Sequence, residues 1–423
     1  AWLFMAFPMS IFVLGLSQAW IALGLISGMY LNWKFVAPRL RILTEKHNCY
    51  TLSSFFEKQF NDPSGIIRVL SAIVMLIFLT HYLSAGLIAM GNLFESIFGL
   101  DYFFGISIAM LVVVIYTFIG GFTTVAWTDL FQGLFLLLMI LIVPFMAFSQ
   151  IDGWNKITTI AHSQGISLSL FPENNFESYF TIFSLALGWG LGYFGMPHII
   201  TKFMGIKDVA DMNKSMRLGM SWQVLTLVAA AFVGIVAIGY FPDGLDKPEL
   251  VFVEMVKSLF HPFLGGFILC AIIAANLSTM DSQILVCGSI LSEDIYVPFH
   301  HKAPSDYKIL LFSKLGVIVI SLIALFLSFN RSSTVLDTVL YSWSGLGSAF
   351  GPLVLLSLYC SSVNRYGAIA GIIVGTSVSM VWPTLNPILT KFQILPMIPA
   401  FILSGASVYI ISRITTRKLH TIQ

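Results

Sequence analysis

A cluster of hydrogen-bonding side chains interrupts one of the most apolar stretches of the chain. The stretch from Phe263 to Leu291 is long enough to cross a bilayer, and it contains Asn276, Ser278, Thr279, Asp281, Ser282 and Gln283. Such groups are costly in hydrocarbon unless they face a protein interior or an aqueous path. Oxygen atoms on successive small residues are the ligands that a hard cation needs when it sheds water. Hydroxyls alone are more typical of hydrogen bonding between helices, but the nearby carboxylate favours an ion path.

A second candidate site lies in residues 187–198, where glycines at 188, 190, 192 and 195 precede Pro197. This composition disfavours a continuous helix, and a broken helix at membrane depth is tolerated where it lines a cavity. Trp189, Tyr193 and Pro197 recur at a spacing of four and therefore share one face. An aromatic-rich wall with free backbone donors suits a small amphiphilic zwitterion. Close helix packing through the glycines is the alternative interpretation.

Asp129 is the other carboxylate that we expect inside an apolar helix, close to the start of a span. By itself, an acid at this position is typical of a helix N-terminus, where the macrodipole favours negative charge. Paired with Asp281, it gives two membrane-embedded carboxylates, which are rare and usually functional.

The composition explains why these groups stand out. The chain is 57% hydrophobic and 10% charged, with a mean hydropathy of +0.89, which identifies a polytopic membrane protein. Its 8 histidines are scattered without the HExxH spacing of a metalloenzyme, so we expect no enzymatic activity. An ion channel would carry a continuous polar stripe along several spans, whereas polarity here is confined to short regions.

Hydropathy predicts the elements that position these residues. After a half-length helix at 1–13, full spans are expected near 17–36, 66–94, 101–119, 124–148, 177–196, 216–240, 263–291, 308–328, 334–358, 367–385 and 394–412. Alternate loops hold most of the Lys and Arg residues, so the positive-inside rule predicts that the C-terminus is cytoplasmic. We expect the protein to lie in the plasma (inner) membrane.

The number of predicted spans indicates an inverted repeat within a single transmembrane domain, residues 1–423. Two groups of an odd number of spans take opposite orientations, which is the construction of many secondary transporters. We expect the first repeat at 1–149, the second at 177–358 and additional helices at 359–423. The short first helix predicts that the native protein extends N-terminally.

Several motifs carry a specific resemblance. Residues 120–129 (GGFTTVAWTD), 192–200 (GYFGMPHII), the pair Ser278-Thr279 and residues 293–296 (EDIY) resemble signatures of the sodium/solute symporter family, in the same order along the chain. The resemblance implies an all-α, LeuT-like inverted-repeat transporter fold with five plus five core helices, additional C-terminal helices and an N-terminally incomplete first helix.

The resemblance also implies roles for individual residues. The members of this family that the chain resembles most transport L-proline, so the resemblance implies sodium-coupled import of L-proline by alternating access. The alternative is another solute of the same family, such as another amino acid, sialic acid, a sugar or pantothenate. Sodium would be held by the Ala275 carbonyl and the hydroxyls of Ser278 and Thr279. The positions implied for solute binding, gating or coupling are Trp2, Tyr116, Trp189, Tyr193 and Pro197.

One residue departs from the closest members of the family, which carry an uncharged small residue where this chain has Asp281. Asp129, Ser278, Asp281 and Ser282 could form a second cation site. A protonated Asp281 that is hydrogen-bonded between helices is the other interpretation. The expected partners are the solute, sodium and the lipid bilayer, with no nucleic acid, and we expect the protein to function as a monomer.

Overall fold

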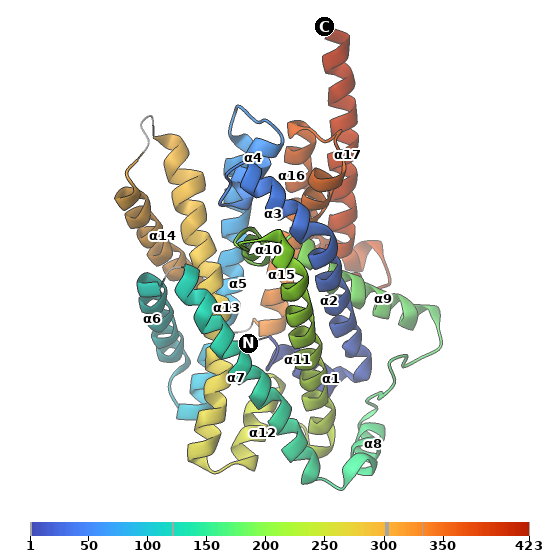
Figure 1. Ribbon diagram of the computed structural model, residues 1–423. Helices are drawn as coiled ribbons and strands as arrows, with labels where there is room; N and C mark the ends of the chain where they lie inside the picture. The colour runs from blue at the N-terminus through green and yellow to red at the C-terminus, as the bar shows by residue number, and fades with distance from the viewer. Residues whose placement is uncertain (1, 121, 301–303, 332, 423) are drawn as a thin grey trace.

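A bundle of upright helices makes up the protein (Figure 1). The computed structural model describes residues 2–120, 122–300, 304–331 and 333–422, with side chains except at 116, 119, 120, 122–124 and 417–422. No strand occurs in those ranges. Within them, 8 helical segments are long and apolar enough to cross a membrane. They are built on α5 (Ile66–Phe98), α7 (Phe122–Ser149), α11 (Met212–Tyr240), α13 (Pro262–Ser289), α14 (Asp306–Leu327), α15 (Val335–Tyr359), α16 (Arg365–Leu389) and α17 (Met397–Ile422).

The remaining predicted spans correspond to shorter helices. They are α1 (Ala6–Leu14), α2 (Ala19–Leu31), α6 (Tyr102–Gly120) and α9 (Phe176–Gly190). The α2 helix continues through a π-turn, η2 (Asn32–Val36), into α3 (Ala37–Lys46), and α13 continues through η6 (Ile290–Tyr296) and η7 (Val297–Phe299). One end of the bundle carries α3, α4 (Leu52–Gln59) and the C-terminus, and the other end carries α8 (Gly153–Gln164) and α12 (Val251–Leu259) (Figure 1).

The predicted break in the glycine-rich helix is confirmed. After Gly190 the chain forms a single 3-10 turn, η3 (Leu191–Phe194), and Met196 is extended before α10 (Pro197–Met204) begins. Proline at the first position of α10 needs no amide partner, because that amide lies outside the helical hydrogen-bond ladder. Two short helices therefore replace one continuous span, and α10 lies at the level of the bundle where α3 crosses it (Figure 1).

Close packing of α2 against α9 explains other glycines, so the alternative interpretation also holds for part of the motif. A Cβ added to Gly24 would lie 2.0 Å from the Ala186 carbonyl oxygen, and one added to Gly28 would lie 2.1 Å from that of Gly190. Helix association in lipid depends on such close contact, since lipid tails are as apolar as the side chains they replace. The two helices are therefore in direct backbone contact.

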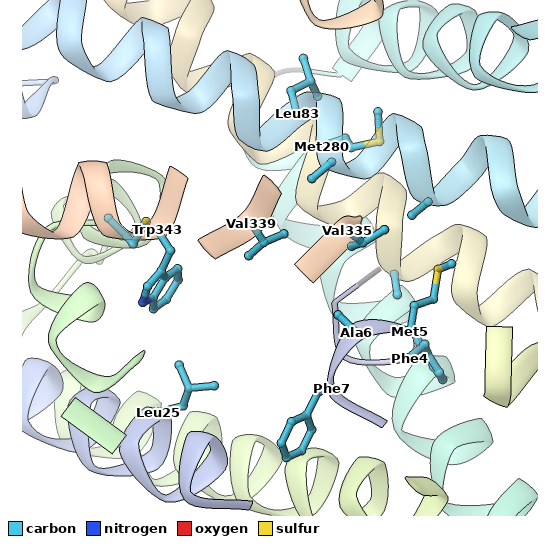
Figure 2. Close-up of a cluster of buried hydrophobic side chains, with 14 of the residues drawn as sticks. Phe4, Met5, Ala6, Phe7, Leu25, Leu83, Met280, Val335, Val339 and Trp343 are labelled. Atoms are coloured by element: carbon cyan, nitrogen blue, oxygen red, sulfur yellow. The ribbon is translucent and has the colours of Figure 1, made fainter. Parts of the chain in front are cut away.

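The core of the bundle is centred on α15, the most deeply buried of the long helices. Figure 2 shows Val335, Val339 and Trp343 of α15 facing Phe7 of α1 and Leu25 of α2 across the centre of the bundle. Leu83 of α5 and Met280 of α13 lie side by side at the edge of the same cluster (Figure 2). This packing fixes α1, α5 and α13 around the region in which the predicted site residues lie.

Candidate functional site

A cavity of about 1080 Å³ reaches the middle of the bundle. Its lining includes Trp2 and Asn276 as well as Tyr50, Lys202 and Ser215. Most of the lining is apolar, and its polar groups come from several elements, among them α5, α7, α10, α11 and α13. A largely apolar cavity with a few convergent polar groups is typical of a small-molecule site.

Ion pairs tie the helices together at the end of the bundle that carries α8 and α12. Glu95 at the end of α5 accepts from Lys247 and from Arg331, each at 2.7 Å. Glu254 of α12 pairs with Lys257 at 2.9 Å and accepts from Ser96 of α5 at 3.0 Å. These contacts hold α12 against the end of α5.

The aromatic residues predicted for solute binding lie together. The rings of Trp2 and Trp189 are 5.1 Å apart, and Trp343 lies 6.0 Å from Trp189 and 5.5 Å from Tyr193. Trp2 and Pro197 line the cavity directly. Trp189 and Tyr193 are buried next to it, with 3% and 8% of their surface exposed. The indole nitrogen of Trp2 is buried and has no hydrogen-bond partner within the described structure, so it is available to an acceptor on a solute.

Neighbouring side chains satisfy the backbone at the break. The Trp343 indole nitrogen donates to the Trp189 carbonyl at 2.9 Å, and the Asn32 amide donates to the Tyr193 carbonyl at 2.9 Å. Gln223 donates to the Tyr193 hydroxyl at 3.1 Å. Two carbonyl groups freed by the break are therefore bound within the protein. The expectation that free backbone donors at the break suit a solute stays a prediction.

Two residues that line the cavity were not among the predicted ligands. Tyr82 of α5 and His198 of α10 lie in an edge-to-face contact with ring centroids 5.6 Å apart. His198 is the second residue of α10, as expected of a residue at a helix end, but it faces the cavity. Its Nδ1 is buried and has no partner in the described part of the chain. The pattern of residues 192–198 placed His198 near the site and gave no sign of which way it faces.

The predicted sodium ligands line one stretch of the cavity wall. Ala275, Ser278 and Thr279 all border the cavity, and the Thr279 hydroxyl donates to the Ala275 carbonyl at 3.2 Å. The Ser278 hydroxyl donates to Oδ1 of Asp129 at 2.5 Å. The structure thus brings a carbonyl, two hydroxyls and a carboxylate together, all of them oxygen ligands suited to a hard cation.

Asp129 has a second partner. Its Oδ2 lies 3.0 Å from the ammonium nitrogen of Lys202 on α10. The side chain of Asp129 is 17% exposed and that of Lys202 is 50% exposed. The sequence analysis did not predict this contact.

Asp281 and Ser282 lie one turn further along α13. Asp281 has no exposed surface, and the Thr117 side chain of α6 lies within hydrogen-bonding reach of its carboxylate. The Ser282 hydroxyl is buried without a partner within the described ranges, and Ser282 lines the cavity whereas Asp281 lies behind it. The Tyr116 side chain, predicted to act in coupling, lies outside the described residues.

Comparison with known proteins agrees with this architecture. The sodium:solute symporter family matches residues 1–375. The osmoregulated proline transporter OpuE of Bacillus subtilis is 40% identical over 420 residues, covering 98% of this chain and 85% of that protein. A sodium/proline symporter of Staphylococcus aureus is 39% identical over 427 residues, covering 98% of this chain and 83% of that protein.

Solved structures show the same fold at low sequence identity. A Na⁺-coupled sialic acid symporter superposes with a TM-score of 0.82 at 17% identity, covering 98% of this chain and 86% of that one. MhsT in complex with L-phenylalanine superposes with a TM-score of 0.55 at 14% identity, covering 97% of each chain. The LeuT-like fold predicted from the sequence is thereby confirmed. Because the family match spans most of the chain and relatives about 40% identical cover nearly all of it, this protein belongs to the sodium:solute symporter family.

Proposed function

We propose that this protein is a sodium-coupled symporter that imports L-proline by alternating access. Relatives named as proline transporters, about 40% identical over 98% of the chain, support this substrate. The alternative substrate is another small solute carried by the same family. The protein moves its substrate without changing covalent bonds, so we propose no enzymatic activity.

One observation carries the proposal: a single cavity borders both the aromatic wall and the predicted cation ligands. Trp2 and Pro197 lie on one part of its surface, and Ala275, Ser278 and Thr279 lie on another. Coupling is a free-energy link between two binding sites, and it is strongest when each ligand orders groups that the other contacts. A solute bound beside Trp2 would share this compartment with the ion.

For the solute, the wall offers both apolar surface and a hydrogen-bond donor. The indoles of Trp2 and Trp189 suit the ring carbons of proline, and the unpaired indole nitrogen of Trp2 suits its carboxylate. Tyr193, in the η3 turn, and Pro197, at the start of α10, complete the wall. Tyr116 remains a proposed coupling residue from the family resemblance alone.

For the transported sodium, we propose the Ala275 carbonyl and the hydroxyls of Ser278 and Thr279 as ligands. The Thr279 hydroxyl now bonds to the Ala275 carbonyl, and a cation bound between them would replace that hydrogen bond by two ion–oxygen contacts. A second cation site is proposed at Asp129, Asp281 and Ser282, next to Ser278. The Ser282 hydroxyl supports it, because it is buried without a partner among the described residues and such polar atoms are rare in proteins.

The distribution of charge supports an orientation. The Lys- and Arg-bearing helices α3, α4 and α10 lie toward the end of the bundle that carries the C-terminus (Figure 1). We propose that this end faces the cytoplasm and that the protein lies in the plasma membrane. We propose residues 1–149 and 177–358 as the inverted repeats, residues 359–423 as peripheral helices, and a functional monomer.

Uptake by the purified protein in liposomes tests the proposal. Radiolabelled L-proline should accumulate when an inward sodium gradient is imposed and should not accumulate with a matched potassium gradient. Unlabelled proline should compete, whereas glucose, sialic acid and pantothenate should not. Strong competition by one of those three would replace proline as the substrate while keeping the mechanism. Uptake that is equal in sodium and potassium would refute sodium coupling itself.

A further inference from the structure

Lys202 forms an ion pair with Asp129, the carboxylate at which a second cation would bind. Its ammonium nitrogen lies 3.0 Å from Oδ2 of Asp129, while Oδ1 accepts from Ser278. Both oxygens of Asp129 are therefore engaged, one by a positive charge and the other by a hydroxyl. Lys202, Asp129 and Ser278 all line the central cavity, so a cation in the cavity and this ammonium would reach the same group.

A sodium ion and the Lys202 ammonium cannot both contact Oδ2 of Asp129 without strong repulsion. Two unit positive charges a few ångströms apart repel each other, and the repulsion grows as water is excluded. Binding of one therefore weakens binding of the other. The arrangement is a competition between a free ion and a cation that the protein carries on its own side chain.

The Lys202 side chain is well suited to enter and leave this position. Half of its surface is exposed, so the ion pair is only partly desolvated, and such pairs contribute little net stability. Its ammonium is a compact point charge on a flexible four-carbon stem, which loses little when it exchanges a carboxylate for water. A rigid, buried arginine fork would be much harder to displace.

The position of Lys202 connects the competition to solute binding. Lys202 lies on α10, five residues after Pro197, and α10 begins at the break that carries the proposed solute wall. Asp129 lies on α7 and Ser278 on α13. A shift of α10 moves the ammonium relative to both, so the strength of the competition depends on the conformation of the broken helix.

We propose that Lys202 is a tethered counter-cation that replaces the second cation at Asp129 when the carrier is empty. After release, the empty transporter must change back to the conformation that faces the side from which solute binds. An unpaired carboxylate at membrane depth would oppose that step. The Lys202 ammonium neutralises Asp129 during the return and lowers its affinity for the ion on the side where the ion leaves. This inference rests on the proposed cation site at Asp129.

Sodium binding by the purified full chain tests the proposal, with radiolabelled sodium as the probe and no solute. Lys202→Gln removes the charge at similar length and should raise the apparent sodium affinity by roughly threefold or more, because the competitor is gone. Lys202→Arg keeps a charge and should not raise it. Lys207→Gln is the matched control, since Lys207 is exposed just after α10 and forms no ion pair with the described residues.

Transport gives a second readout that a merely structural role would not produce. In Lys202→Gln, solute exchange with sodium saturating on both sides should be affected less than net uptake, because during exchange the carrier never returns empty. Net uptake, which needs the empty return, should be slowed. A fall in sodium affinity, or values equal to those of Lys207→Gln, would overturn the proposal. If the Gln variant does not fold, Lys202→Ala makes the same test.

Asp129→Asn separates this inference from the site on which it rests. If a cation binds at Asp129, the Asn variant should lose sodium affinity, and adding Lys202→Gln to it should produce no further change. An Asn variant with normal sodium binding would refute the cation site itself. Weakened binding in Asp129→Asn together with no gain in Lys202→Gln would refute only the role of Lys202.

Discussion

The indole of Trp343 is bonded to the backbone of Trp189, 154 residues earlier in the chain, at a nitrogen–oxygen distance of 2.9 Å. This contact joins α15 to the last turn of α9, where the helix breaks. Gly192 lies beneath the same indole, and a Cβ added there would be 2.0 Å from the indole nitrogen. The position of the break and the position of Trp343 therefore depend on each other.

Replacing Gly192 tests that dependence. Gly192→Ala forces the Trp343 indole or the η3 turn to move, which should raise the KM for proline by about tenfold, equivalent to ~1.4 kcal/mol. Gly266→Ala is the control, because nothing lies within 4 Å of a Cβ at that position. Uptake kinetics of the two variants at equal expression give the comparison, and equal kinetics would show that the break tolerates the methyl group.

We expect Trp189, in the aromatic wall, to contribute to binding of the solute and not of the ion. Trp189→Ala removes the indole that packs on Trp2, and we expect proline binding to weaken by about tenfold or more. Sodium binding measured without proline should stay close to that of the unmodified protein. Equal losses of both would assign Trp189 to packing alone.

The hydroxyls of Ser278 and Thr279 should each contribute to the proposed sodium site. Ser278→Ala and Thr279→Ala remove a ligand from an ion that has lost water, so apparent sodium affinity should fall by about tenfold, or ~1.4 kcal/mol. Ser289→Ala is a matched control, since this hydroxyl also lies on α13 and borders the cavity but bonds to the Leu285 carbonyl. If both variants keep normal sodium dependence, the ion binds elsewhere.

Asp281 distinguishes the two interpretations of the buried carboxylate. If Asp281 belongs to a second cation site, Asp281→Asn should lower the sodium Hill coefficient of transport from about two toward about one, with unchanged solute specificity. A protonated structural acid predicts no change, since Asn has a similar shape and is also neutral. The sodium dependence of initial uptake rates gives the coefficient.

Asp62 should stabilise the fold in a pH-dependent way. Its carboxylate accepts from the amide and hydroxyl of Ser64 and from the Ile67 amide at 2.9 Å, just before α5. Burial alone would raise the pKa of Asp62, but these hydrogen bonds outweigh it and lower the pKa below its usual 3.8. The stabilisation is therefore present above the unfolded-state pKa and is lost as pH falls through the lower, folded-state value.

Thermal unfolding of the detergent-solubilised protein measures this effect. Asp62→Asn should cost about 1 kcal/mol near neutral pH, and the difference from the unmodified protein should shrink under strongly acidic conditions. Asp243→Asn, in an exposed loop after α11, is the control. A pH-independent difference would attribute the effect to shape and not to charge.

The sequence alone was enough to locate the features that violate a simple pattern. Ser278, Thr279 and Asp281 interrupt an apolar run, and the glycines before Pro197 interrupt a helix, so each is visible from its immediate neighbours. The spans and the fold class follow from hydropathy and from long motifs. These predictions depend on local composition, which a chain displays before it folds.

Pairings between distant residues could not be predicted in this way. Lys202 resembles the other basic residues near the ends of spans, and its partner Asp129 lies 73 residues earlier. Trp343 lies in a Gly- and Ser-rich stretch that gives no sign of its contact with Trp189. Tyr82 is one aromatic residue in a long apolar helix. Only the tertiary packing shows which of these residues face the cavity.

The backbone contact of α2 with α9 has a mechanical consequence. The backbones of α2 and α9 touch at Gly24 and Gly28, which lie against Ala186 and Gly190. We therefore expect α2 and α9 to move together as one rigid unit. The link between them and α10 lies at Gly195 and Met196, where the η3 turn ends and extended backbone leads into α10. A bend at this link would move α10 relative to α2 and α9, and the Lys202 ammonium, near the C-terminal end of α10, would move furthest.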